Sequence, residues 1–428
     1  MAKTGSESMA GCSHVAHSSA GPERSHDPRW QCLVALTLAR AAMGFQFQAV
    51  AAVAPLLAPA LGIDKTQLGW LIGLYLLPGV AFALPGGLLG RRFGDKRLVL
   101  VGLALMAIGG AGLALAESFA AANVARFVSG VGAVILNVLV TKMVTDLFEG
   151  RERLLAMSVL INSWPSGIGI ALLVIGPLGE AAGWRWGVAS STAFALIGLG
   201  LVAAVYRAPG AGPLPTGPAG IGLGVLARRE WNLLTIGSLP WLLYNAAYQI
   251  VISFLPSFLV GNGFGIASAG SLMALNTVMF VVGVQSGGVL LKRTARPDRI
   301  CHAMIVAWCA TLLFIAAGSA PLPWLVLGGL LGGIPAAALV SVPGEFVRPE
   351  SRSAGMGVFY TIYYAGCAVL PTLAGALYDA SGGKAALWMA TGLAMAAALT
   401  LGLFRRAMRT GAPAEVGSSR ILSTDAHP

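Results

Sequence analysis

Residues 85–97 read Pro-Gly-Gly-Leu-Leu-Gly-Arg-Arg-Phe-Gly-Asp-Lys-Arg, and this stretch decides the fold. It joins the glycine-rich end of one apolar segment to the start of another through a dense basic turn. Small residues let two transmembrane helices approach closely, and lysines and arginines favour the cytoplasmic side of a bilayer. The stretch therefore predicts two membrane spans that are joined by a cytoplasmic loop.

The stretch also has a second copy in the chain. Residues 287–293, Gly-Gly-Val-Leu-Leu-Lys-Arg, repeat it with an offset of 201 positions. A register that is kept through most of each half indicates a duplicated unit, and two similar halves are typical of secondary transporters. The pairs that keep an offset of 201 or 199 include Gln48 and Gln249, Pro55 and Pro256, Glu180 and Asp379, and Gly183 and Gly382.

The composition places the chain in a bilayer. Of its 428 residues 56% are hydrophobic and only 11% are charged, and the mean hydropathy is +0.77. The net charge is +11, but only three of the 28 Lys and Arg residues (Lys65, Arg185 and Lys384) fall in predicted outer loops. Three more lie inside predicted spans, and the rest are in predicted cytoplasmic segments. This bias predicts that both termini are cytoplasmic and explains the charge through anionic membrane lipid, without nucleic acid.

The sequence contains twelve apolar segments that are long enough to cross a hydrocarbon core of about 30 Å. They divide the chain into a disordered cytoplasmic tail (1–30), a six-helix bundle (31–206), a Pro- and Gly-rich cytoplasmic linker (207–230), a second six-helix bundle (231–405) and a cytoplasmic tail (406–428). The predicted spans are 31–60, 66–90, 98–116, 121–145, 154–178, 185–206, 231–260, 267–291, 300–318, 322–345, 354–378 and 385–404.

The basic turn resembles a signature of the major facilitator superfamily, Gly-x-x-x-Asp-Arg-x-Gly-Arg-Lys, which lies between that family's second and third helices. Aligned from Gly87, four residues match, and Arg91 stands at the family's acidic position. The four are Arg92, Gly94, Lys96 and Arg97. Residues 78–87 look most like the cyanate and nitrate permease branches. The resemblance implies an all-α fold of twelve helices in two homologous bundles.

The same resemblance implies roles for an arginine inside a predicted span and for residues that act in the conformational cycle. The stretch from Arg126, Arg-Phe-Val-Ser-Gly-Val-Gly, is similar to the family's helix 4 signature Arg-x-x-x-Gly-x-Gly, which points this arginine at a central cavity. The basic turn and its repeat imply a gating role for Gly87, Arg92, Gly94, Arg97, Gly288 and Arg293.

Polar residues inside predicted spans are the candidate substrate site, because each costs free energy in a bilayer, about 3 kcal/mol for arginine on insertion scales. Arg126 shares a stripe with Asn137 at helical spacing, and Arg40 lies deep in the first span. Aromatic and amide side chains beside an arginine suit a small polar or anionic ligand. The predicted substrate-binding residues are Arg40, Gln48, Arg126, Asn137, Tyr244, Asn245, Tyr248 and Gln249. For Arg40 the alternative is a side chain that snorkels toward the inner surface, for Arg126 a brace between helices, and for the aromatic and amide residues interhelical hydrogen bonding.

Motifs of enzymes, nucleotide binding, metal sites and paired thiols do not occur in the sequence. We therefore expect no enzyme, no catalytic residue, no cofactor and no metal. The first hypothesis is a secondary transporter in the cytoplasmic (inner) membrane that moves a small anionic solute by alternating access. It would be driven by a gradient, of a coupling proton or a counter-substrate. The alternatives are a drug or metabolite efflux carrier and a non-transporting ligand sensor.

Overall fold

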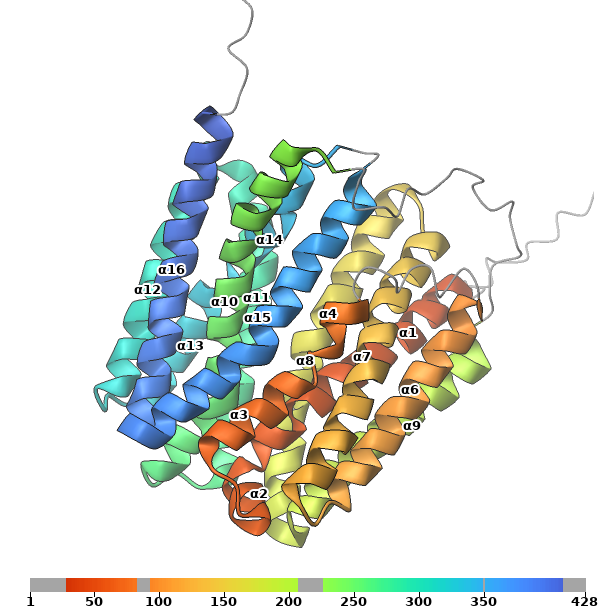
Figure 1. The fold of residues 1–428 in the computed structure, drawn as a ribbon, viewed down its shortest axis with the longest axis vertical. Coiled ribbons are helices and arrows are strands. Elements are labelled where there is room, and N and C mark those ends of the chain that lie inside the picture. The colour runs from red at the N-terminus through yellow and green to blue at the C-terminus, as the bar shows by residue number, and fades with distance from the viewer. Residues whose placement is uncertain (1–27, 83–92, 207–225, 349–350, 411–428) are drawn as a thin grey trace, which may run out of the picture.

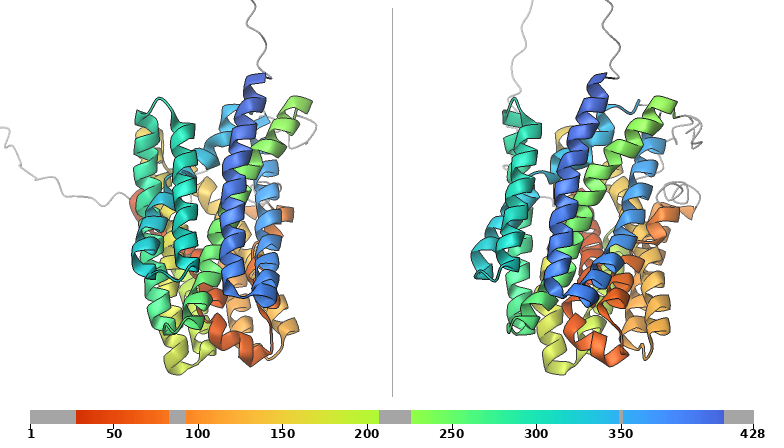
Figure 2. Two further views of the ribbon diagram at one scale, coloured as in Figure 1. Left: turned by 90° about the vertical axis from the view of Figure 1, so that its left-hand side faces the viewer. Right: turned by 60° about the vertical axis from the view of Figure 1, so that its left-hand side comes forward.

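The computed structural model describes residues 28–82, 93–206, 226–348 and 351–410, and every regular element in these ranges is helical. Long helices run side by side and form one bundle (Figures 1 and 2). Within the described ranges, 11 helical segments are long and apolar enough to cross a membrane. The predicted all-α membrane fold is confirmed.

The first six predicted spans correspond to eight described helices. They are α1 (Pro28–Ala52), α2 (Ala54–Leu61), α3 (Lys65–Leu74), α4 (Pro78–Phe82), α6 (Asp95–Ala114), α7 (Phe119–Leu147), α8 (Gly150–Ala182) and α9 (Trp184–Val205). The second predicted span, 66–90, is described only as α3 and α4 with a turn between them, because residues 83–92 lie outside the described ranges. Most of the basic turn, including Gly87 and Arg92, therefore has no structural description.

The last six predicted spans correspond to α10 (Arg228–Gly261), α11 (Ile266–Arg293), α12 (Pro297–Ala316), α13 (Pro321–Gly333), α14 (Ala336–Ser341), the short 3-10 helix η2 (Val342–Glu345), α15 (Arg352–Ser381) and α16 (Gly383–Thr410). Prolines act in two ways in these helices. The helix breaks just before Pro55 and at Pro335, whereas α8 continues through Pro165 and α10 through Pro256.

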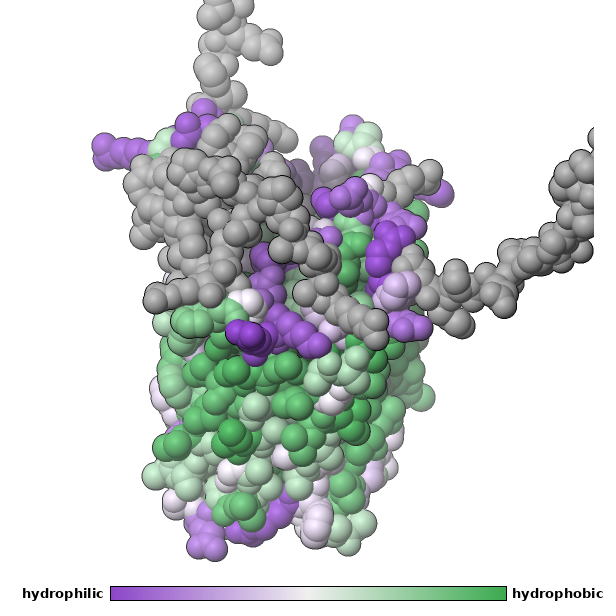
Figure 3. Space-filling view, turned by 90° about the vertical axis from the view of Figure 1, so that its right-hand side faces the viewer, coloured by the Kyte–Doolittle hydropathy of each residue, from purple (hydrophilic) through white to green (hydrophobic). Residues whose placement is uncertain are grey.

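The outer surface of the bundle is apolar between two polar ends. Figure 3 shows a broad hydrophobic band on one face, with hydrophilic residues gathered above and below it. Large apolar side chains such as Ile108, Leu196, Ile197 and Leu399 are more than half exposed on this surface. In water such exposure would be costly, whereas in a bilayer these side chains contact lipid tails. The fold is therefore that of a multi-pass membrane protein.

Two helix pairs make the most extensive contacts between the first six spans and the last six. Helix α3 packs along α15, and α8 packs along α11. Glycines allow both contacts, because an added Cβ at Gly69 would meet the carbonyl of Pro371, and one at Gly270 would meet the carbonyl of Leu172. Both contacts lie toward the end of the bundle that holds the α8–α9 and α15–α16 turns, which we call the outer end. The division into two domains at the stated boundaries stays a prediction.

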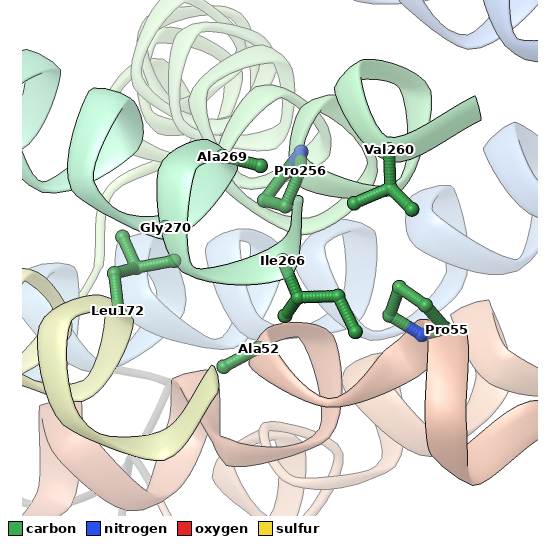
Figure 4. Close-up of a pocket in the computed structure, with 8 residues that line it drawn as sticks. All are labelled: Ala52, Pro55, Leu172, Pro256, Val260, Ile266, Ala269 and Gly270. Atoms are coloured by element: carbon green, nitrogen blue, oxygen red, sulfur yellow. The ribbon is translucent and has the colours of Figure 1, made fainter. Parts of the chain in front are cut away.

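The two sets of helices meet closely at the outer end and leave only a small cavity between them, lined by residues with apolar side chains (Figure 4). It has a volume of about 10 Å³, and its walls come from α1, α2, α8, α10 and α11. A space of this size holds at most one water. The lining residues are Ala52, Pro55, Leu172, Pro256, Val260, Ile266, Ala269 and Gly270. This part of the seam between the helices is closed to a solute.

Candidate functional site

Arg40 on α1 is a partly exposed cation inside the bundle. Its Nε donates to the side-chain oxygen of Asn137 on α7 (2.9 Å), and its Nη1 donates to the carbonyl of Leu160 (2.7 Å) on α8. The same nitrogen reaches the carbonyl of Ile161 (3.2 Å) and the hydroxyl of Ser163 (3.3 Å). Nη2 donates to none of the described residues, and no described carboxylate forms an ion pair with Arg40.

The local sequence explains why α8 offers a carbonyl to this arginine. In an α-helix the carbonyl of Ile161 would accept a hydrogen bond from the N–H of residue 165, but Pro165 has no N–H. The Ile161 carbonyl therefore lacks its helical donor, and Arg40 supplies one. The sequence predicts that the Ile161 carbonyl lacks a helical donor, because a proline follows four positions later. It does not indicate which side chain donates to this carbonyl instead.

Asn137 extends the polar contact to the second half of the chain. Its side-chain nitrogen donates to the hydroxyl of Tyr364 on α15 (3.1 Å). Tyr364 contacts Tyr363 edge to face (5.1 Å between ring centroids), and Tyr363 lies 6.2 Å from the ring of Trp241 on α10. Tyr363, Tyr364 and a third tyrosine of α15, Tyr360, all lie close enough to the Arg40 guanidinium to interact with its charge. An arginine, an amide and an aromatic wall are thus brought together from four helices.

Asn245 belongs to the same wall. It is partly exposed on α10, one turn after Trp241, and its side-chain nitrogen donates to the Trp241 carbonyl (2.9 Å). Of the eight residues predicted for the substrate site, Arg40, Asn137 and Asn245 are the three with partly exposed side chains. Tyr360, Tyr363, Trp241 and Ser163 join them, although they are not among those eight.

Arg126 on α7 lies in a different setting. Its side chain is fully buried, and its three nitrogens donate to the carbonyls of Leu71 (3.0 Å), Gln46 (2.8 Å) and Phe47 (2.7 Å). The guanidinium carbon also lies 4.4 Å from the ring centroid of Tyr75. The arginine therefore ties α7 to α1 and α3 through backbone groups.

The four remaining predicted residues are also buried. Gln48 donates to the carbonyl of Ile252 on α10 (2.7 Å), which has no helical donor because Pro256 follows four positions later. The hydroxyl of Tyr244 donates to the Gly332 carbonyl at the end of α13, where helical donors run out. Tyr248 stacks on Phe280 with 4.2 Å between ring centroids, and Gln249 lies beside the thiol of Cys367.

The predicted gating residues are described in part. Gly94 precedes α6 with a φ of 85°, and Arg97 and Arg293 are exposed at helix ends. A Cβ added to Gly288 would meet open space, whereas one added to Gly287 would meet the backbone of Ile334. The helix contact in the repeated stretch is therefore made by the neighbouring glycine. A gating role for these residues stays a prediction.

Comparisons with known proteins agree with this architecture. The sequence model of the Major Facilitator Superfamily matches residues 36–343. The 3-(3-hydroxy-phenyl)propionate transporter of Escherichia coli is 28% identical over 347 residues, which cover 78% of this chain and 83% of that one. The hexuronate transporter of Bacillus subtilis is 23% identical over 289 residues, covering 63% and 66%.

The fold also occurs among solved structures. A mutant form of the nucleoside transporter NupG superposes with a TM-score of 0.72 at 15% identity, over 88% of this chain and 100% of that one. At this identity the likeness concerns the fold alone. None of these three proteins is named a cyanate or nitrate permease, so the resemblance to those branches stays a prediction.

Proposed function

The chain belongs to the Major Facilitator Superfamily and is a membrane transporter, and on this premise we propose that it carries a small organic anion by alternating access. The observation that supports this most is the setting of Arg40. It is partly exposed, it has one nitrogen without a protein partner among the described residues, and no described carboxylate neutralises it. A cation inside a membrane protein is costly unless it is paired, and an anionic substrate supplies the missing charge.

The counter-charge is thereby assigned to Arg40 rather than to Arg126. A guanidinium N–H donates a strong, charge-assisted hydrogen bond to a carboxylate oxygen. Arg126 uses all three of its nitrogens on backbone carbonyls, whereas Nη2 of Arg40 remains for a ligand. The neighbouring tyrosines and Trp241 would pack against the rest of the solute, and Asn137 and Asn245 would orient it.

The relatives favour a carboxylate. 3-(3-Hydroxyphenyl)propionate and hexuronate, named in two of the relatives, are both organic acids that are ionised at neutral pH. We place the protein in the cytoplasmic membrane with both termini inside, and we assign its energy to a gradient of protons or of a counter-substrate.

Arg40 variants test the proposal in proteoliposomes with labelled 3-(3-hydroxyphenyl)propionate and labelled glucuronate. Arg40→Ala should lower the affinity for the transported acid by roughly 30- to 5000-fold, since removing one partner of a desolvated charge pair costs about 2–5 kcal/mol. Arg40→Lys should retain part of the affinity, because it keeps the charge but loses the planar fork. Arg228→Ala, which removes an exposed charge at the start of α10, is the matched control.

Neutral analogues separate this function from the alternatives. The primary amide of the same acid should be neither bound nor moved. Uptake of the amide equal to that of the acid, or unchanged affinity in folded Arg40→Ala, would contradict the anion proposal and support an efflux carrier for neutral compounds. Binding without accumulation in sealed vesicles would support a sensor instead.

A further inference from the structure

Two carboxylates cross from one half of the chain to the other at the outer end of the bundle. Asp379, near the end of α15, accepts hydrogen bonds from the backbone N–H groups of Lys65 (3.0 Å) and Thr66 (2.8 Å). It also accepts one from the Thr66 hydroxyl (2.8 Å). Lys65 and Thr66 are the first two residues of α3, so the carboxylate binds N–H groups that have no acceptor within their own helix.

The second carboxylate repeats this arrangement on the other seam. Glu180, near the end of α8, accepts from the backbone N–H groups of Ile266 and Ala267, both at 3.2 Å. These are the first two residues of α11. The residue before that helix, Gly265, has no side chain with which to cap it, so Glu180 is the side chain that caps α11.

The internal repeat relates the two contacts to each other. Lys65 and Ile266 are 201 positions apart, and Glu180 and Asp379 are 199 apart. Each acid lies three residues before a glycine with positive φ, Gly183 (95°) or Gly382 (81°), which makes a one-residue turn into the next long helix. The same interaction is therefore built twice, once on each seam between the first six and the last six spans.

The chemistry of the contact favours a closed outer end. A carboxylate at a helix N-terminus is stabilised by charge-assisted hydrogen bonds and by the helix dipole. The glycine contacts at Gly270 and Gly375 bring the backbones close enough for these short side chains to reach across. Burial lowers the pKa of the Lys65 ammonium, and the negative charge of Asp379 partly opposes this, as expected of a carboxylate beside that helix end.

We infer that Asp379 and Glu180 are a pair of outer-gate latches, which hold the two halves together at the outer end and release when this end opens. When α15 moves away from α3, or α8 from α11, the carboxylates lose these N–H partners, so the contacts stabilise the closed state selectively. A contact made in only one of two states shifts their ratio. By the measured worth of helix caps, each latch should shift the closed-to-open ratio by about fivefold to tenfold.

Distance measurements on the full-length protein in lipid test the inference without any substrate. Spin labels at Ala120 and Ala320, two exposed outer positions in different halves, report the separation by double electron–electron resonance in a cysteine-free background. Asp379→Ala and Glu180→Ala should each raise the open-to-closed ratio by about fivefold to tenfold. The double variant should multiply the two effects, because the two contacts join different helix pairs and share no partner.

Three further variants make the result decisive. Glu117→Ala removes an exposed carboxylate at the same end and should leave the distances unchanged. Gly270→Leu should widen the distance, because its side chain would meet the α8 backbone, and so shows that the labels detect opening. Asp379→Asn keeps the shape of the side chain and one acceptor oxygen but removes its charge. It replaces Asp379→Ala in the same measurement if the alanine variant does not fold.

A double latch variant whose open-to-closed ratio stays within twofold of the wild-type value overturns the inference. The inference rests on the alternating access proposed above but not on the identity of the solute. If the latch variants open the outer end but the protein moves no anion, the latch inference is supported and the anion-transport proposal is contradicted. Normal latch behaviour is therefore distinguishable from a failure of the proposed function.

Discussion

Arg40 and Arg126 are both arginines inside spans, and their surroundings give them different expected roles. The Arg126 guanidinium donates to three buried carbonyls and has no exposed surface. Its removal would take away three charge-assisted hydrogen bonds, each worth about 1.5–3 kcal/mol, and together these are a large share of the stability of a typical domain. We therefore propose that Arg126 braces three helices and that Arg40 faces the solute.

We expect Arg126→Ala to reduce the yield of folded protein sharply and to lower the melting temperature of the remainder. Arg126→Lys should recover part of the loss, because an ammonium reaches one or two of the three carbonyls. Thermal unfolding in detergent with size-exclusion analysis measures both effects. Wild-type yield and melting temperature in Arg126→Ala, together with lost binding, would return the substrate role to Arg126.

At the scale of helices, close crossings decide which glycine of a pair matters. Gly287 and Gly288 are adjacent in α11 and both belong to the repeated stretch 287–293. Gly287 is buried against the backbone of Ile334, whereas Gly288 has no heavy atom within contact distance of an added Cβ. The two positions therefore form a natural control for each other.

Gly287→Ala should destabilise the protein by about 1–3 kcal/mol, because overpacking a close helix contact forces the backbones apart. Gly288→Ala should change the free energy of unfolding by less than about 0.5 kcal/mol or raise it slightly, since alanine favours the helix. Denaturant unfolding in detergent compares the two variants. Equal effects at both positions would remove the packing argument for this crossing.

At the scale of the whole molecule, the described helices place alternate connections at opposite ends of the bundle (Figure 2). The charge bias predicts that the outer end faces the outside of the cell. Cysteines at Glu117 and Ala320 should then react with a membrane-impermeant maleimide in intact cells, and cysteines at Asp298 and Lys292 should react only after permeabilisation. The opposite pattern would invert the orientation, and labelling of all four would contradict the assignment of spans.

The sequence was informative where the governing interaction is local. Eleven of the twelve predicted spans correspond to described apolar helical segments, because hydropathy over about 20 residues determines whether a segment can cross a bilayer. The sequence was less informative about which side chains of a helix are buried and which face the candidate site. Helical spacing placed Arg126 and Asn137 on one stripe, but only tertiary packing separates the buried arginine from the asparagine that contacts Arg40. The partners of both are backbone carbonyls or distant side chains, which no spacing rule identifies.

The hydrogen bond from Gln48 to the carbonyl of Ile252 constrains the order in which these positions can change during evolution. The donor is on α1, and the need for it arises from Pro256 on α10, a proline on the other half of the chain. If Gln48 is lost first, a buried carbonyl is left without a donor, whereas the replacement of Pro256 by a residue with an N–H removes the need beforehand. The order of substitution is therefore constrained. Lineages of this transporter should have exchanged the proline before, or together with, the glutamine.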